Sequence, residues 1–270
     1  MPLPKSRYCF WSVVDGRYAP MMETLIASAR RVGVEQEFHI WTKQPVSGAV
    51  SHSVGDFNKS HYLFKLRFLQ EEVRKLDYEY FVWLDADNYF VRDPGDLTAL
   101  LRHAPLHVTF ESDACNPVNR RLDWWGCPLA EFATLMRKRG VKSHAIFNLN
   151  AGFWIVHRDV IDTLCKFAFA FWEESRVAGY TFTEEAPLAY AAHMLCGNPY
   201  NHTLSKTSEY WASDWTGRYK GRLPDGLPWL FEDYFSGERM LVNPAIVHAM
   251  RSKQVMFAVA RGEKVIETLN

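Results

Sequence analysis

Short apolar runs alternate with stretches of helical periodicity through the first 110 residues. The runs are rich in β-forming residues and lie at 8–14, 38–42, 80–84 and 106–110. Apolar residues at helical spacing fill 20–32 and 63–76, with Ser60 as the expected N-cap of the second helix and Asp93-Pro94 as the expected entry to another helix. This alternation predicts βαβ units and an α/β fold with a mostly parallel central sheet flanked by helices. Ligands of such sheets bind beyond the carboxyl ends of the strands.

The second part of the chain is less regular. We expect a strand at 153–156, a helix at 159–172 capped by Asp159, and a helix at 183–195. From 198 to 236 the periodicity fades and Gly, Pro, Tyr and Trp become frequent, which predicts irregular, substrate-facing loops. Because no linker-like stretch interrupts the chain, we expect one domain over 1–270, with a ligand-binding half at about 7–110 and a second half at about 111–255.

Composition narrows the class of partner and the compartment. Lys plus Arg and Asp plus Glu both number 31, so no net field draws the protein to nucleic acid. The five cysteines are odd in number and form no C-x-x-C pair, which favours reduced thiols and a cytoplasmic location. The first residues carry no apolar run, so neither a signal peptide nor a transmembrane segment is expected. The sequence does not indicate an oligomeric state.

The most informative motif follows the apolar run at 80–84. Asp85-Ala86-Asp87 places two carboxylates two residues apart, and the alternation of a strand would put both on one side. Such close like charges favour a divalent cation, and hard oxygen ligands suit Mg²⁺ or Mn²⁺ bridging to a diphosphate. The alternative is an acidic turn before the next helix. Its position after an apolar strand in a βαβ series favours the metal interpretation.

Other residues precede and follow this motif in a recognisable order. Together with the motif, the set is Val14, Asp15, Tyr18, Lys65, Asp85, Ala86, Asp87, Asn150, Ala151, Gly152, Glu184, Glu185, His248 and Lys253. The order resembles that of GT-A (Rossmann-like) glycosyltransferases, and most closely the retaining family-eight branch that includes glycogenin and bacterial galactosyltransferases. The resemblance spans about residues 7–255. It implies transfer of a sugar from a nucleotide-sugar donor, expected to be a UDP-sugar, to a hydroxyl of a glycan-type acceptor.

The resemblance also implies roles on the nucleotide side. Val14, Asp15 and Tyr18 would hold the base and ribose, and the Asp85-Ala86-Asp87 segment would contact the donor. Asp87 would bind the metal directly and Asp85 would be shared between metal and ribose. His248 would complete the metal site, and an imidazole beside two carboxylates favours Mn²⁺ over Mg²⁺.

Further roles concern the diphosphate and the sugar. Lys253 would neutralise the diphosphate, and Lys65 would contact donor groups. The small residues of 150–152 would let the backbone approach the sugar. Glu184 and Glu185 fall where the family has an acidic or amide pair near the anomeric carbon, although acidic residues at the start of a helix also favour the macrodipole without any catalytic role.

The stereochemistry and the enzyme class stay open at this level. In an inverting reaction Glu184 or Glu185 would deprotonate the acceptor, and in a retaining one they would stabilise positive charge at the anomeric carbon. The alternatives are a haloacid-dehalogenase phosphatase, a sugar nucleotidyltransferase and a non-catalytic carbohydrate-binding protein. Several tryptophans in loop-like stretches could pack on a sugar ring of the acceptor, namely Trp124, Trp125, Trp211, Trp215 and Trp229.

Overall fold

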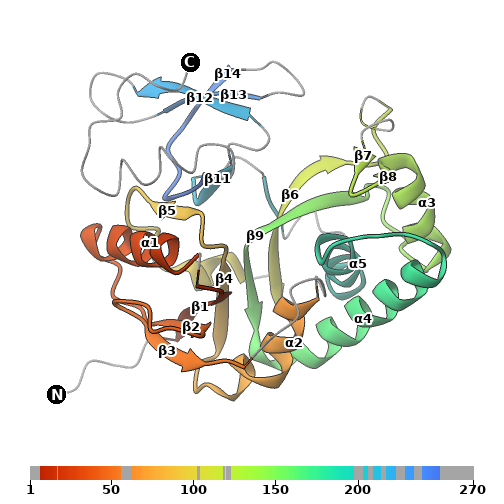
Figure 1. The fold of residues 1–270 in the computed structure, drawn as a ribbon. Helices are drawn as coiled ribbons and strands as arrows, with labels where there is room; N and C mark the ends of the chain where they lie inside the picture. Colours follow the sequence, from red (N-terminus) through yellow and green to blue (C-terminus); the bar gives the residue numbers. More distant parts are fainter. Residues whose placement is uncertain are drawn as a thin grey trace. The chain divides into compact units, whose positions relative to one another are not determined.

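The chain is mixed α/β, with a central, mostly parallel sheet flanked by helices, in a computed structural model (Figure 1). The structure describes residues 7–16, 18–55, 63–101, 104–117, 119, 123–197, 203–205, 209–213, 217–222, 229–233 and 239–249. The chain divides into two compact units, each built from separated segments. Unit 1 comprises Met1–Cys9, Asp56–Trp83 and Leu97–Thr203, and unit 2 comprises Phe10–Gly55, Leu84–Asp96 and Leu204–Asn270.

Unit 2 begins with a parallel arrangement of strands. Its elements are β1 (Tyr8–Val14), α1 (Ala19–Arg31), β2 (Phe38–Thr42) and β3 (Val50–Ser53). β2 pairs in parallel with both β1 and β3. The predicted bounds of the first two strands are confirmed, because both are continuous buried runs. Strand β3 was not predicted, because its residues are mostly exposed and polar and form no apolar run.

Unit 2 also contains two small sheets. β5 (Asn88–Phe90), β11 (Trp211–Ser213) and β15 (Ile246–His248) form one sheet in the order β11-β15-β5. β12 (Gly217–Arg222), β13 (Trp229–Asp233) and β14 (Arg239–Val242) form the other. Strands therefore occupy several stretches of 198–236 for which loops were expected, and they are too short to leave a clear periodic signal. In the core, Phe10 stacks on Phe38 and the ring of Phe90 meets both edge-on.

Unit 1 layers helices on strands. Its strands include β4 (Tyr80–Leu84), β6 (Leu106–Asp113) and β9 (Phe147–His157), in the order β6-β9-β4. Strand β10 (Thr203–Ser205) begins at the last residue of unit 1. The helices are α2 (Phe64–Glu71), α3 (Leu129–Lys138), α4 (Ile161–Val177) and α5 (Glu185–Cys196). Three short 3₁₀ helices lie at η1 (Val73–Lys75), η2 (Leu97–Leu101) and η3 (Arg158–Val160). Helix α5 packs on β6 and β9, and α4 packs on α5. A small hairpin, β7 (Asp123–Trp124) and β8 (Cys127–Pro128), precedes α3.

Several predicted boundaries move in the structure. The helix expected at 159–172 is α4, which begins at Ile161 after η3, so Asp159 is not its cap; instead the Asp159 N–H donates to the ring of His157. Helix α2 begins at Phe64 with Leu63 before it, and Ser60 lies outside the described residues. Only the short η2 follows Asp93-Pro94. These starts lack a side-chain cap that a sequence pattern could reveal.

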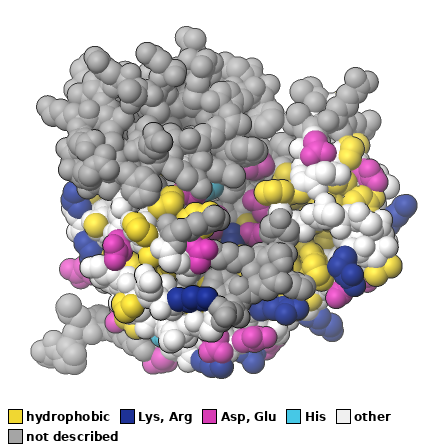
Figure 2. Space-filling model, viewed as in Figure 1, with side chains coloured by type: hydrophobic (Ala, Val, Ile, Leu, Met, Phe, Trp, Pro, Cys, Tyr) yellow, Lys and Arg dark blue, Asp and Glu magenta, His cyan; other side chains and the backbone are white. Residues whose placement is uncertain are grey.

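The described surface mixes both signs of charge. Acidic and basic side chains are interspersed on the face shown in Figure 2. Within the described residues, no helix combines the length and apolar character needed to cross a bilayer. Burial raises the pKa of Cys127 and Cys165 to about 12 and that of Cys196 to about 11, which keeps these thiols protonated at neutral pH.

Candidate metal centre and carboxylate cluster

Asp85 and Asp87 lie in the turn that follows β4. The strand ends at Leu84, and the turn leads directly into β5 at Asn88. The backbone N–H of Asn88 donates to the Asp85 carbonyl at 3.1 Å, and its side-chain amide donates to the same carbonyl at 2.9 Å. The expectation that strand alternation aligns the two carboxylates is therefore wrong. The turn, closed by Asn88, brings them together.

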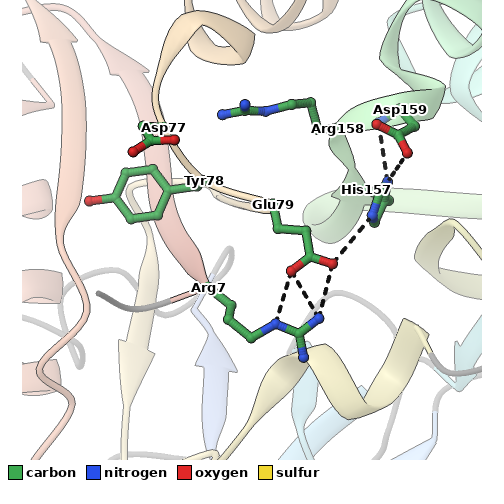
Figure 3. Close-up of a pocket in the computed structure, with 7 residues that line it drawn as sticks. All are labelled: Arg7, Asp77, Tyr78, Glu79, His157, Arg158 and Asp159. Atoms are coloured by element: carbon green, nitrogen blue, oxygen red, sulfur yellow. Dashed lines mark hydrogen bonds and ion pairs between the residues drawn. The ribbon is translucent and has the colours of Figure 1, made fainter. Parts of the chain in front are cut away.

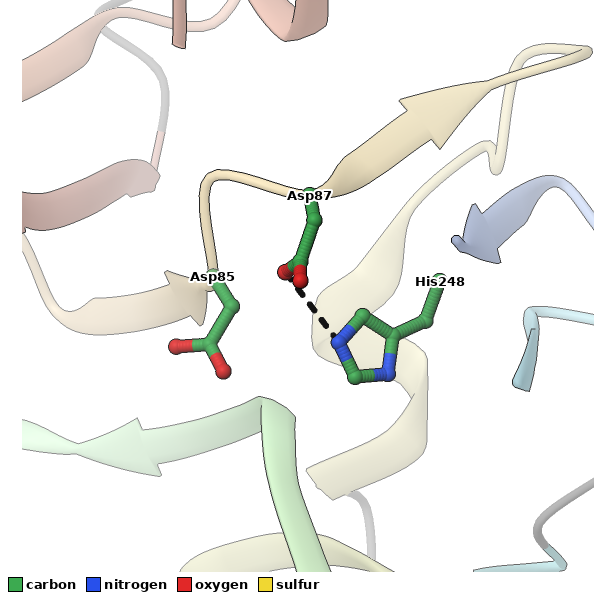
Figure 4. Close-up of side chains that lie close together, drawn as sticks. All are labelled: Asp85, Asp87 and His248. Carbon is green, nitrogen blue, oxygen red and sulfur yellow. Dashed lines mark hydrogen bonds and ion pairs between the residues drawn. The ribbon is translucent and has the colours of Figure 1, made fainter. Parts of the chain in front are cut away.

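His248 completes this group from a distant part of the sequence. β15 pairs with β5 so that His248 lies opposite Asn88, and the Ala249 N–H donates to the Asp87 carbonyl at 2.9 Å. One ligand atom each from Asp85, Asp87 and His248 lies within 4.8 Å of the others, and His248 Nε2 is 3.2 Å from Asp87 Oδ1 (Figure 4). Asp87 and His248 are 8% and 2% exposed. We call these three residues the metal cluster.

The imidazole of His248 is fixed from two sides. Its Nδ1 lies 3.1 Å from Ser213 Oγ, and its ring stacks on Trp211 with the ring centroids 5.4 Å apart. The indole of Trp211 donates to Asn88 Oδ1 at 2.9 Å, which ties the stacking partner to the turn. Because Ser213 engages Nδ1, Nε2 is the nitrogen presented to the carboxylates. Such support of the second ring nitrogen is typical of metal-binding histidines.

The Asp87–His248–Ser213 chain has the connectivity of a hydrolase triad but not its accessibility. Ser213 has no exposed surface, and a nucleophile must reach its substrate. The donor set itself, with two carboxylates and one imidazole, suits Mn²⁺ or Mg²⁺ and leaves coordination positions for ligand oxygens. The residues present therefore fit a divalent cation.

A second polar group lies in unit 1, around the start of α5. Glu184 forms an ion pair with Lys65 at 2.5 Å, and both side chains are largely buried. The Lys65 ammonium also lies over the Trp83 ring, 4.8 Å from its centroid. Glu185 accepts from the Ala151 N–H at 3.0 Å and from the Trp125 indole N–H at 2.5 Å. The helix-start position of both glutamates is confirmed, but their side chains are also held by specific partners.

Glu111 joins this group through two asparagines of β9. It accepts from the side-chain amides of Asn148 and Asn150, each at 3.1 Å. We call Lys65, Glu111, Glu184 and Glu185 the carboxylate cluster. Glu185 has a pKa well above its ordinary value, because burial disfavours the ionised form and because Glu111 and Glu184 add like charge.

The contact with Glu185 lies at an irregular point of β9. Val108 and Thr109 of β6 face Trp154 and Asn150, so the register of the pairing shifts between these two residues. Within the shifted stretch the Ala151 N–H donates to Glu185, and the Gly152 N–H donates to Asn150 Oδ1 at 2.8 Å. The Asn150-Ala151-Gly152 segment thus lies inside a longer strand than predicted.

The other predicted residues have simpler surroundings. Val14 is buried at the end of β1, and Asp15 and Tyr18 form the turn into α1, where the Tyr18 N–H donates to the Asp15 carbonyl at 3.0 Å. Ala86 lies between the two aspartates of the turn. Lys253 lies outside the described residues. Of the tryptophans considered for sugar contact, Trp124 and Trp211 are buried and Trp125 is 44% exposed. Trp215 lies outside the described residues, as does the side chain of Trp229.

Sequence reasoning missed Asn88, Glu111, Asn148 and Ser213, which shape the two groups, and it considered Trp211 only for sugar contact. The alternation of Asn148 and Asn150 was a usable signal, because it places two amides on one face of a strand. Trp211 and Ser213 left no such signal, since their partner His248 lies on another strand far along the chain.

A surface cavity of about 350 Å³ in unit 1 is a separate feature (Figure 3). Its charged groups engage one another: Arg7 donates to both oxygens of Glu79, each at 2.9 Å, and His157 lies 3.6 Å from the same carboxylate. The Arg7 guanidinium holds the pKa of Glu79 below its ordinary value. This ion-pair network belongs to unit 1, whereas the metal cluster belongs to unit 2. We assign it no catalytic role.

The sequence matches no protein-family model, and no curated protein sequence shows significant similarity to it.

Proposed function

We propose that this protein is a metal-dependent glycosyltransferase that moves a sugar from a nucleotide-sugar donor, a UDP-sugar in the first instance, to a hydroxyl of a glycan-type acceptor. The observation that carries the proposal is the metal cluster, in which two carboxylates and an imidazole converge directly after a buried strand. The resemblance of the sequence motifs to GT-A glycosyltransferases supports it. The carboxylate cluster supplies a second set of groups suited to a sugar.

In this proposal Asp85, Asp87 and His248 hold Mn²⁺ or Mg²⁺. The cation, when bound, supplies Lewis acidity that stabilises negative charge on a departing diphosphate. The chain contributes a site whose ligands are already oriented, since Asn88 closes the turn and Ser213 and Trp211 fix the imidazole. Val14, Asp15 and Tyr18 are assigned to the base and ribose of the donor.

The carboxylate cluster is assigned to the sugar. A raised pKa moves Glu185 towards neutral pH, where a carboxyl group is most effective in proton transfer. Two N–H donors hold its oxygens in place. In an inverting reaction Glu185 accepts the proton of the acceptor hydroxyl, and in a retaining reaction the same carboxylate stabilises positive charge at the anomeric carbon. The positive charge of Lys65 offsets the negative charge of Glu184, which reduces the negative charge near Glu185.

The test is a screen of UDP-, GDP-, CDP- and dTDP-sugars with Mn²⁺, following release of the nucleoside diphosphate. We expect slow metal-dependent release from one donor and none with Asp87→Asn. Glu173→Gln, an exposed carboxylate on α4, is the matched control and should behave as the wild type.

The same screen separates the alternatives. Release of inorganic phosphate from a phosphate monoester would favour a phosphatase, and release of pyrophosphate from a nucleotide triphosphate and a sugar phosphate would favour a nucleotidyltransferase. Sugar binding with no turnover of any donor would favour a carbohydrate-binding protein. Any of these results would replace the proposal.

A further inference from the structure

Trp125 occupies a backbone position that folding alone does not favour. Asp123 pairs with Pro128 and Trp124 with Cys127, so Trp125 and Gly126 form a two-residue turn between β7 and β8. Their φ values are 55° and 77°, and Trp125 is the one non-glycine residue with positive φ in the described part of the chain. Asn-Gly is the preferred pair for such turns, because a bulky side chain is strained at positive φ. A tryptophan here costs stability that asparagine would not.

The rest of the hairpin does not explain the tryptophan. Asp123 Oδ1 accepts from the Gly126 N–H at 3.0 Å and closes the turn without help from the Trp125 side chain. The neighbouring Trp124 supplies the packing, since it is buried and its ring meets Phe132 edge-on at 4.8 Å. Trp125, by contrast, is 44% exposed.

The position of the Trp125 side chain links this turn to the carboxylate cluster. Its indole N–H donates to Glu185 Oε2 at 2.5 Å. Trp125 is at the same time well exposed for so large an apolar residue, so apolar surface lies at the solvent next to a carboxylate of raised pKa. A flat apolar surface beside a hydrogen-bonding carboxylate is the combination that binds a sugar ring, whose C–H faces are apolar and whose hydroxyls lie at the rim.

We propose that Trp125 is the platform of a carbohydrate subsite, on which a hexopyranose ring of the acceptor stacks while a hydroxyl reaches Glu185. The indole N–H has a second role as a positioning group for that carboxylate. This inference rests on the proposed function, and it goes beyond it by naming a hexose-containing acceptor and the residue that selects it.

The experiment measures sugar binding by saturation-transfer NMR, with no donor and no metal present. The probes are lactose, maltose, cellobiose and the methyl glycoside of N-acetylglucosamine. We expect at least one probe to bind the wild type and Trp125→Asn to weaken it by about tenfold or more. Trp125→Phe, which keeps a ring but not the N–H, should stay within about threefold of the wild type. Trp172→Phe, on α4, is the matched control and should bind as the wild type does.

Thermal unfolding distinguishes this role from a purely structural one. If Trp125 served stability, its replacement would lower the melting temperature. Asparagine tolerates positive φ, so Trp125→Asn should melt at the same temperature as the wild type or higher. A lower melting temperature would contradict the argument from backbone strain. The proposal is overturned if no probe binds the wild type, if Trp125→Asn binds normally, or if Trp125→Phe loses binding as fully as Trp125→Asn.

Failure of this inference is distinguishable from failure of the proposed function. Binding of Mn²⁺ and UDP is measured separately by calorimetry and depends on the metal cluster. If the protein binds the sugar but neither Mn²⁺ nor UDP, the subsite proposal stands and the transferase proposal fails. If it binds Mn²⁺ and UDP but no sugar, the transferase proposal stands and the subsite proposal fails.

Discussion

The metal cluster of unit 2 and the carboxylate cluster of unit 1 both gather acidic side chains, but they are organised differently. In the carboxylate cluster the fold supplies a counter-charge and donors of its own, namely Lys65, two asparagine amides, a backbone N–H and an indole. The metal cluster instead combines two carboxylates with an imidazole, a side chain that can be neutral, and this set of groups can serve as ligands for a cation. Unit 1 thus surrounds its acids with a counter-charge and hydrogen-bond donors, whereas unit 2 sets an imidazole beside its two carboxylates.

The largest expected effect comes from removing the positive charge that compensates the carboxylates of unit 1. Lys65→Met should lower the free energy of unfolding by about 3–5 kcal/mol, because it leaves Glu184 without its ammonium beside Glu111 and Glu185. Urea unfolding checks this. Lys75→Met removes an exposed partner of Glu72 and should change stability by less than about 0.5 kcal/mol. Adding Glu184→Gln to Lys65→Met should restore part of the loss, and no recovery would argue against charge as the cause.

The second prediction tests whether the metal cluster of unit 2 binds a cation. Asp87→Asn should lower Mn²⁺ affinity by more than about 100-fold, since even loss of an indirect partner of a metal ligand costs up to that amount. Calorimetric titration measures this. Mn²⁺ should also raise the melting temperature of the wild type but not that of the variant, because a ligand that binds only the folded state stabilises it by mass action. The exposed Glu35→Gln is the control. Equal Mn²⁺ affinity in wild type and Asp87→Asn would remove the metal assignment.

A third prediction concerns pH and distinguishes the two groups again. The folded-state pKa of Glu185 is raised above 4.5, so the folded protein binds more protons than the unfolded one at intermediate pH. Its contribution is fully present below about pH 4.5 and is lost as pH rises through the folded-state value, at up to about 1.4 kcal/mol per pH unit. Glu185→Gln should flatten this decline in urea unfolding between pH 5 and 8. An unchanged slope would place the proton elsewhere.

The smallest expected effect refines the metal cluster. Ser213→Ala should lower Mn²⁺ affinity by about tenfold, because Ser213 no longer holds Nδ1 and the His248 ring loses its fixed orientation. The control is Ser175→Ala, which removes a buried hydroxyl in the other unit, unit 1. This variant should lower stability but leave Mn²⁺ affinity unchanged. If both serines affect Mn²⁺ binding equally, the effect is a general loss of stability.

The sequence predicts best where burial is complete and contacts are local. The bounds of β1, β2 and β4 follow from continuous apolar runs, and the aspartate pair follows directly after β4. The exposed strand β3 and the uncapped helix starts had no comparable pattern. For the metal cluster, the aspartate pair was predicted from its place after an apolar run and His248 from the family resemblance, but the turn that joins the two aspartates was mistaken for strand.

The supporting residues were harder to foresee. Ser213 and Trp211 act on His248 only because β11 and β15 pair, and nothing near them in sequence indicates this register. Glu111 acts on β9 through the pairing of β6 with β9. Trp125 was one of several tryptophans predicted for sugar contact. Among those whose side chains the structure describes, its exposure, its positive φ and its hydrogen bond to Glu185 distinguish it.

The pairing of β15 with β5 has a consequence for biosynthesis. Asp87 and His248 lie 161 residues apart in the sequence, and each unit combines segments that are distant from one another in the chain. The imidazole can therefore join the two aspartates only after the ribosome has completed β15, and a fragment that stops earlier carries the aspartates without it. Under the proposed function, such a fragment should bind Mn²⁺ more weakly than the full sequence does.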